Sequence, residues 1–233
     1  MIAGMISVII PTFNAQKDLG PTLAALVPAA IRGLVSEVIV ADGGSTDETT
    51  LIAEAAGATI LRGTGGRGPQ LRAGAEAARC RWLLFLHADT RLDQSWEAEA
   101  ETFIREIEQG ERPQRAAAFR FALDDHGIMP RVLEALVALR CALFKLPYGD
   151  QGLLMSRRLY DAVGGFQPLP LMEDVDMIRR LGRSRVAILS PRAVTSPVRY
   201  RREGYLKRMA RNVYCLALFY LNVPVSRIVR IYG

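Results

Sequence analysis

The sequence is poor in cysteine and histidine, the residues that build disulfide frameworks and many metal centres. Among its 233 residues are three cysteines and two histidines. Cys80, Cys141 and Cys215 are odd in number, widely spaced and not arranged in CxxC pairs, so a disulfide framework is not expected. We predict buried, reduced thiols in a cytoplasmic protein.

Long apolar runs and the signature of a nucleic-acid-binding protein are also missing. No run reaches the ~20 residues of a membrane-spanning helix; the nearest, 213–221, is too short and precedes Pro224. Residues 1–5 carry neither the charged start nor the cleavage site of a signal peptide. The N-terminal half holds no basic patch interleaved with aromatics. The net charge of +6 therefore indicates an anionic ligand or surface, and no nucleic acid is expected as a partner.

What the chain does contain is a regular alternation of strands and helices over its first 90 residues. Apolar runs predict strands at 6–10, 37–41, 58–61 and 83–86, and periodic segments predict helices at 19–30, 45–56 and 71–78. Ser45 and Glu48 have the spacing of a capping box at the start of the second helix. The pattern predicts an α/β protein with a doubly wound, mostly parallel sheet flanked by helices.

After residue 90 the alternation is looser. Helices are expected at 96–109, 130–144, 172–182 and 205–220, and strands at 116–123, 153–155, 186–189 and 193–199. No linker, internal repeat or low-complexity tract divides the chain. We therefore predict one domain over residues 1–233 with two functional halves, about 5–90 and about 91–233.

The strand expected at 83–86 ends at two polar residues, His87 and Asp89. Ligands of open α/β sheets bind beyond the carboxyl ends of the strands, and an acid there can hold a hard divalent cation that in turn holds a diphosphate. His87 alternates onto the same side. Imidazole suits such cations less well than oxygen, so a histidine hydrogen-bonded at the sheet edge is the alternative.

Two glycine-containing segments are candidate nucleotide contacts. Asp42 ends the second strand and could accept hydrogen bonds from a base or a ribose, while Gly43 and Gly44 would let a ligand approach the backbone. A plain tight turn explains the same residues. The loop at 63–68 matches neither the GxGxxG nor the Walker pattern; its Arg67 could contact a phosphate, and a mobile surface loop is the alternative.

Charged clusters lie in the second half. Glu173, Asp174 and Asp176 open a helix, where acids are stabilising, but three within four residues exceed the need for capping, and one is a candidate general base. Crowding of like charges would raise a carboxylate's pKa. The basic run at 199–211 could bind a diphosphate, contact anionic lipid or form a solvated helix face.

Several of these segments occur in the order seen in a known enzyme family. They are Ile9–Asn14, Val40–Asp47, His87–Thr90 and Met172–Asp176, together with Gly66–Leu71 and Tyr148–Gly152. In this combination the chain resembles the family 2 glycosyltransferases of the GT-A fold, most closely a bacterial subgroup of small, single-domain members. The resemblance runs from Ile6 to about Tyr232 and implies the GT-A (nucleotide-diphospho-sugar transferase) fold, with donor binding in the first half and acceptor binding in the second.

The resemblance also implies a role for each matching position. Asp174 would be the base that deprotonates the acceptor hydroxyl, and Gln151 and Glu173 would contact the acceptor. Asp89, with His87 as a weaker ligand, would bind the divalent cation, Mn²⁺ or Mg²⁺. The nucleotide-sugar donor would be held by Pro11, Thr12, Phe13, Asn14, Asp42, Gly43, Gly44, Arg67, Gln70 and Arg199.

Departures from the family pattern shape the expected activity. His87 stands where the first Asp of the DxD element is usual, and Ser196 and Tyr200 replace the Gln and Trp of the QxxRW element. Processive polysaccharide synthases keep both of the latter and add membrane helices. The implied activity is a single, non-processive, inverting and metal-dependent transfer of a sugar from a nucleoside-diphosphate sugar to an acceptor hydroxyl.

Two other functions stay open. A nucleotidyltransferase shares this sheet architecture but normally carries a glycine-rich, basic loop after the first strand, where this chain has Pro11–Asn14. A non-catalytic protein could bind a nucleotide sugar or act as a scaffold at a membrane. The acceptor is also open. The apolar faces of helices 130–144 and 205–220 are compatible with a lipid-linked acceptor and with peripheral contact at the inner membrane face.

Overall fold

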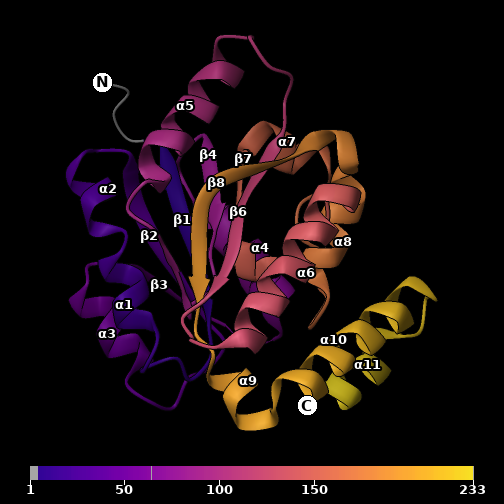
Figure 1. Ribbon diagram of the computed structural model, residues 1–233. Coiled ribbons are helices and arrows are strands. Elements are labelled where there is room, and N and C mark those ends of the chain that lie inside the picture. The colour runs from indigo at the N-terminus through magenta and orange to yellow at the C-terminus, as the bar shows by residue number, and fades with distance from the viewer. Residues whose placement is uncertain (1–4, 64, 233) are drawn as a thin grey trace.

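An eight-stranded mixed sheet runs through the centre of the molecule, with helices on both of its faces (Figure 1). The computed structural model describes residues 5–63 and 65–232. The predictions for residues 1–4 and for Thr64 lie outside these ranges. The strand order is β3-β2-β1-β4-β7-β6-β8-β5.

The first four strands are parallel, as predicted, and the rest of the sheet is mixed. β7 is antiparallel to β4 and β6, β8 is parallel to β6, and β5 is antiparallel to β8. The strands are β1 (Ile6–Thr12), β2 (Val35–Asp42), β3 (Thr59–Arg62), β4 (Trp82–Phe85), β5 (Thr90–Leu92), β6 (Ala116–Leu123), β7 (Leu153–Ser156) and β8 (Val186–Thr195). Because β1, β2 and β4 run the same way, the residues that follow them meet at one edge of the sheet.

Eleven α-helices and two short 3₁₀ turns are present in the described ranges. The helices of the first half are α1 (Leu19–Ala24), α2 (Val27–Ile31), α3 (Thr49–Ala55), α4 (Arg67–Ala77) and α5 (Trp96–Glu108). Those of the second half are α6 (Ile128–Phe144), α7 (Arg157–Ala162), α8 (Glu173–Leu181), α9 (Val198–Glu203), α10 (Tyr205–Tyr220) and α11 (Val225–Tyr232). The 3₁₀ turns are η1 (Gly149–Gln151) and η2 (Arg183–Arg185).

Alternation along β1 divides the core into two layers. Ile6, Val8 and Ile10 belong to a cluster that α1, α2, α3 and α5 complete on one face of the sheet. Ile9 points to the opposite face, where α4, α7 and α8 supply the apolar side chains. Residues that are buried on both faces explain why the strand reads as a continuous apolar run.

Two predicted helices differ in detail from the structure. The helix expected at 19–30 is split into α1 and α2, because Pro28 has no N–H with which to bond the carbonyl of Ala24. The predicted capping box is wrong: α3 begins at Thr49, and the Ser45 hydroxyl donates instead to Oδ1 of Asp42 at 2.5 Å. A capping box would use the Ser45 oxygen as the acceptor for a backbone N–H of the helix, but this oxygen accepts the N–H of Asn14 at 2.8 Å.

Three other predicted boundaries differ from those in the structure. α4 begins at Arg67 rather than Leu71, with Pro69 in its first turn, where the missing N–H costs nothing. The two late strands are one strand, β8, and the segment after it forms α9 rather than a strand. Gly204, at a φ of 84°, separates α9 from α10, a backbone conformation that glycine adopts without strain.

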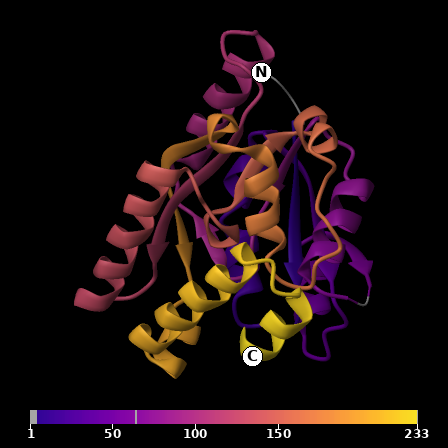
Figure 2. The same ribbon diagram turned by 90° about the vertical axis from the view of Figure 1, so that its right-hand side faces the viewer.

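The C-terminal helices form a hairpin beside the carboxyl edge of the sheet (Figure 2). Cys215 of α10 and Ile228 of α11 are fully buried against Met172 and Val175 at the start of α8. The predicted helix at 205–220 is confirmed, whereas α11 was not predicted. Across residues 5–63 and 65–232, every helix is too short or too polar to cross a bilayer.

The packing of α4 on β1 can be tested at Gly74, because a Cβ there would lie 2.4 Å from Cγ2 of Ile9. We expect Gly74→Ala to lower the free energy of unfolding by about 1–3 kcal/mol, the usual cost of overpacking a core. Gly20→Ala, whose Cβ meets nothing within 4 Å, is the matched control and should be neutral or stabilising. Urea unfolding measures both; equal effects of the two substitutions would contradict the close packing.

Candidate active site

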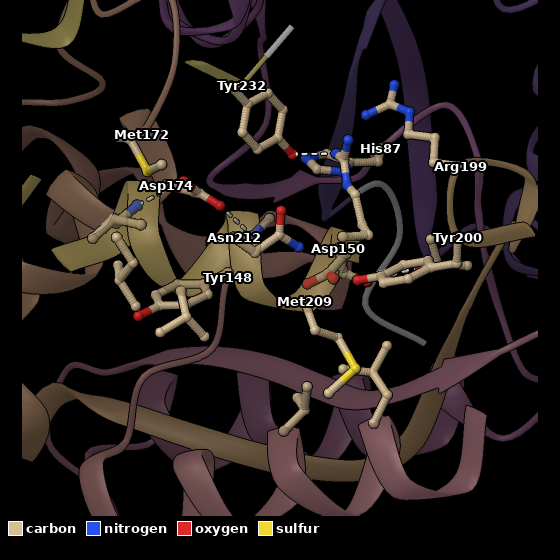
Figure 3. Close-up of a pocket in the computed structure, with 18 of the residues that line it drawn as sticks. His87, Tyr148, Asp150, Met172, Asp174, Arg199, Tyr200, Met209, Asn212 and Tyr232 are labelled. Atoms are coloured by element: carbon tan, nitrogen blue, oxygen red, sulfur yellow. Dashed lines mark hydrogen bonds between the residues drawn. The ribbon is translucent and has the colours of Figure 1, made fainter. Parts of the chain in front are cut away.

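A cavity of about 400 Å³ lies at the carboxyl edge of the sheet, between α6, α8 and α10. In Figure 3, His87, Asp150, Asp174 and Arg199 come from four separate segments and surround the same space. Its lining contains Arg67, His87, Asp89, Asp150, Asp174 and Arg199, and also Arg140 and Arg208. The structure therefore brings together five of the predicted site residues and adds Asp150, Arg140 and Arg208, which were not among them.

Asp174 is fixed by the loop that faces it. It is the second residue of α8, and its Oδ2 accepts the N–H of Gly149 at 2.7 Å. A Cβ on Gly149 would lie 2.5 Å from Nε2 of His87 and 3.1 Å from Oδ2 of Asp174. Only glycine permits this approach, which holds the carboxylate beside the histidine.

His87 and Asp89 both line the cavity just beyond β4. Burial, reinforced by the nearby charges of Arg67 and Arg199, lowers the pKa of His87 well below its usual value. The imidazole is therefore neutral near pH 7 and has a nitrogen lone pair for a metal ion. Within the described residues, no three His, Cys, Asp or Glu side chains are grouped closely enough to hold a metal ion alone.

Behind Asp174 lies a buried ion pair. Glu173 is fully buried, and its Oε1 is 3.6 Å from Nη1 of Arg67, which reaches it from the first turn of α4. In the described part of the chain neither carboxylate oxygen has a hydrogen-bond partner. Burial, together with the charge of Asp174, raises the pKa of Glu173 to about 7 even though Arg67 opposes the rise.

Asp150 adds a third carboxylate to the cavity. Its buried Oδ1 has no hydrogen-bond partner among the described residues. Burial raises the pKa of Asp150 to about 6; Arg140 opposes the rise, and the charges of Asp174 and Asp89 add to it. An unpartnered carboxylate that faces a cavity is available to a ligand. Its position in the predicted loop 148–152 was the only signal in the sequence.

A second polar cluster lies at the ends of β1 and β2, outside the cavity. Asp42 is buried and accepts hydrogen bonds from the hydroxyls of Ser45 and Thr12 and from the backbone of Gly44. Burial alone would raise the pKa of Asp42, but these hydrogen bonds outweigh it and hold the pKa below its usual value. Asp42 is thus a fixed carboxylate at the edge where a nucleoside is predicted.

Gln70 supports this cluster through the backbone. Its Nε2 donates to the carbonyls of Thr12 and Ala41, at 2.7 and 2.8 Å, which ties α4 to the ends of both strands. A Cβ on Gly43 would lie 2.9 Å from the same atom. The donors of Gln70 are therefore used within the protein, and its predicted contact with the nucleotide stays a prediction.

Phe13 and Asn14, which follow β1, are more exposed than Asp42. Phe13 is 65% exposed, and Asn14 adopts a φ of 51°. The side-chain carbonyl of Asn14 accepts the N–H of Thr46, while its own N–H donates to Ser45. The loop after β1 is thereby tied to the loop after β2, and an exposed aromatic ring stands beside Asp42's cluster. This arrangement is compatible with a base stacked on Phe13.

Gln151 lies behind the cavity rather than in its lining. It is almost fully buried, its Nε2 donates to the carbonyl of Phe119 at 2.8 Å, and its Oε1 accepts from Arg140 at 3.3 Å. Glu173 is likewise absent from the lining of the large cavity. The acceptor contacts predicted for Gln151 and Glu173 stay untested, and in this structure both side chains support residues that do line the cavity.

The basic run at 199–211 is largely paired within the protein. Arg201 forms an ion pair with Asp125 at 2.6 Å, and Glu203 lies among Arg202, Arg208 and Arg211. Arg199 alone of the run's first three arginines lines the cavity. Arg208 is buried and donates to the hydroxyl of Tyr232, so α11 is held over the site.

The burial of Glu173 predicts a pH dependence of stability. Since its pKa is about 7 in the folded protein and 4.5 ordinarily, the folded state binds more protons between these values, and stability falls as the pH rises through this range. Glu173→Gln removes this loss, so the variant should match the wild type near pH 5 and exceed it by roughly 2–3 kcal/mol at pH 8. Urea unfolding at both values tests this; Glu54→Gln, an exposed change, should show no such difference.

Comparison with known proteins places this chain in a family. The model of glycosyl transferase family 2 matches residues 7–132. Two glucosyl-3-phosphoglycerate synthases, from Mycolicibacterium smegmatis and Mycolicibacterium paratuberculosis, are 43% and 41% identical to the chain over 56 residues, or 24% of its length. The matched segment is only 18% and 17% of the length of these relatives.

Solved structures extend the likeness to nearly the whole chain. Glucosyl-3-phosphoglycerate synthase from Mycobacterium tuberculosis in complex with Mn²⁺, UDP and glucosyl-3-phosphoglycerate superposes with a TM-score of 0.60 at 24% identity, over 95% of this chain and 81% of that one. Its complex with phosphoglyceric acid gives 0.62 at 22% identity and the same coverage. At such identities the likeness concerns the fold, and it confirms the predicted GT-A fold. Because the family model also spans more than half of the sequence, the chain belongs to glycosyl transferase family 2.

Proposed function

We propose that the protein transfers a sugar from a nucleoside-diphosphate sugar to an acceptor hydroxyl. The observation that carries the proposal is the single cavity in which Asp174 faces Asp89, His87 and two arginines. A carboxylate opposite cationic groups is the arrangement that a displacement at a sugar carbon requires. The carboxylate accepts the proton of the acceptor hydroxyl, and the cationic groups stabilise the leaving diphosphate.

The donor would lie along the carboxyl edge of the sheet. Thr12 and Asp42 would hold its nucleoside, and Arg67 and Arg199 would contact the diphosphate as it enters the cavity. A guanidinium can donate two parallel hydrogen bonds to the oxygens of a phosphate. The Mycobacterium tuberculosis enzyme has been solved with UDP-glucose and Mn²⁺, which makes UDP-glucose the first donor to test.

The residues beyond β4 suit a hard divalent cation. Such ions are usually held by one or two protein ligands together with phosphates and water, and Asp89 with the neutral His87 supplies that number. We assign these two side chains to Mn²⁺ or Mg²⁺. When bound, the cation would supply Lewis-acid stabilisation of the charge on the diphosphate.

The chemical step follows from the position of Asp174. Its carboxylate takes the proton from the acceptor hydroxyl, and the oxygen attacks the anomeric carbon as the bond to the diphosphate breaks. The nucleoside diphosphate leaves on the side of Arg67 and Arg199, so attack from the opposite side inverts the anomeric centre. Asp150 faces the same cavity and would accept a hydrogen bond from a sugar or acceptor hydroxyl.

The departures from the family pattern favour one transfer per encounter. Ser196 and Tyr200 occupy the positions of the Gln and Trp of the processive synthases.

The loop after β1 also lacks the glycine-rich character of a nucleotidyltransferase, and such an enzyme would release pyrophosphate rather than a nucleoside diphosphate. A purely binding protein would release neither.

Asp174→Asn should lower the rate of nucleoside diphosphate release about 10³-fold, because a general base contributes on that order. Donor binding should stay nearly the same, since the change is isosteric and preserves an acceptor for Gly149. A coupled assay for UDP release, with titration of UDP-glucose, separates the two effects. The control is Asp176→Asn, which removes an ion pair with Arg180 on the same helix. If the Asp174→Asn variant turned over at the wild-type rate, Asp174 would be excluded as the base.

Asp89→Asn should abolish the part of donor affinity that depends on the cation. In the wild type, Mn²⁺ should enlarge the increase in Tm that UDP-glucose produces, because a ligand of the native state stabilises it. In the variant, the increase should equal that measured with chelator. Asp161→Asn, an exposed change on α7, should behave like the wild type. A wild type whose donor affinity ignores chelator would overturn the metal assignment.

A further inference from the structure

One helix beside the active site exposes a continuous apolar stripe. On α6, Ile128, Val132, Leu136, Leu139 and Leu143 recur at spacings of three and four, so they lie on one face of the helix. Each of the five is at least 42% exposed. The opposite face, with Leu133 and Val137, packs against β6. The stripe is therefore not part of the hydrophobic core.

A second stripe lies on α10, and the cavity between the two helices contacts both stripes, the one on α6 through Leu136. Leu206, Met209, Val213, Leu216 and Tyr220 follow the same spacing, and the three central ones line the cavity. Leu206 is 72% and Val213 66% exposed. The cavity is thus an apolar groove between two helices, with Asp174 and Asp150 at its inner end.

Exposed apolar side chains gather on this side of the molecule. Of the 18 large hydrophobic residues exposed in the described ranges, 14 lie on α6 or within residues 198–231. Single exposed apolar residues are ordinary, whereas a concentration beside a pocket marks a binding surface. The four elsewhere are Phe13, Val27, Ile31 and Leu51.

The exposed charge on the C-terminal hairpin is positive. From Gly204 to the end of the sequence there is no acidic residue, and Lys207, Arg227 and Arg230 are basic and exposed, whereas Arg208 and Arg211 pair with Glu203. An amphipathic helix with basic side chains beside an apolar face binds at the surface of an anionic bilayer. Positive charge of this kind adds attraction to negatively charged lipid head groups.

We infer that the acceptor is an amphiphile drawn from an anionic lipid surface, with its hydrocarbon chain between α6 and α10. The inference rests on the proposed transfer and names its acceptor class. The stripes would meet the acyl region, the basic residues the head groups, and the groove would lead the acceptor's hydroxyl to Asp174. A wholly polar acceptor would leave the apolar walls in contact with water, at a cost in free energy.

The test is co-flotation of the full chain with lipid vesicles, without donor or metal. We expect it to bind vesicles of phosphatidylglycerol and phosphatidylcholine, and to bind pure phosphatidylcholine more weakly. The double variant Leu139→Glu/Leu206→Glu alters one residue of each stripe outside the cavity lining. Its partition coefficient should be lower by about tenfold or more, because both side chains lose apolar burial and gain negative charge.

The matched control is Ile31→Glu/Leu51→Glu, which makes the same change on α2 and α3, away from the groove. These two side chains are 81% and 62% exposed, and the control should float like the wild type. UDP-glucose binding, measured as the increase in Tm with Mn²⁺, should be equal in all three proteins. If it is absent in all three, the proposed transfer fails independently of the vesicle result.

Three outcomes would overturn the inference. In the first, the wild type does not float with anionic vesicles. In the second, the stripe variant floats as well as the control. In the third, sedimentation shows that the stripes are buried in a dimer that the stripe variant dissociates. Saturation by phosphoglyceric acid of a site that the stripe substitutions leave unchanged, with no vesicle binding, would assign a polar acceptor instead.

Discussion

The structure depends on one close approach, at Gly149. There the turn η1 brings its backbone against His87, which follows β4, and donates to Asp174 at the start of α8. A side chain at this position would separate the two residues. Because β4 carries the candidate metal ligands and α8 carries the candidate base, this contact fixes the distance between the donor side and the acceptor side of the site.

The charged side chains around Gly149 partly compensate one another. Glu173 is buried behind the cavity and pairs with Arg67, which lines the cavity together with Asp174, Asp89 and Asp150. Three carboxylates in one cavity repel one another, and burial raises the pKa of Asp150. Burial also lowers the pKa of His87, and the charges of Arg67 and Arg199 lower it further. A bound cation would offset the negative charge of the carboxylates, and the arginines would offset the negative charge of the diphosphate. This compensation of charge would strengthen donor binding.

The sequence predicted the first half of the fold well, because the apolar runs of β1, β2 and β4 are buried on both faces and need no distant partner to be recognised. It predicted the second half less well. Residues 193–195 of the strand predicted at 193–199 belong to β8, but the chain beyond them forms α9, which Pro197 and Gly204 flank. In the first half, Ser45 looked like a helix cap, yet its oxygen accepts the N–H of Asn14 from the loop after β1. The Ser45 error arose because its partner comes from a segment 31 residues away in the sequence.

For the site, the sequence by itself determined which residues end the parallel strands, and therefore that Asp42, His87 and Asp89 share one edge. It also determined that Asp174 opens a helix. Only the tertiary structure decided which polar side chains stay free. Gln70 and Gln151 donate to backbone carbonyls, Arg201 pairs with Asp125, and Asp150 is left facing the cavity. The physical reason is that strand ends and helix starts follow from local periodicity, whereas the partner of a long polar side chain depends on segments far away in the sequence.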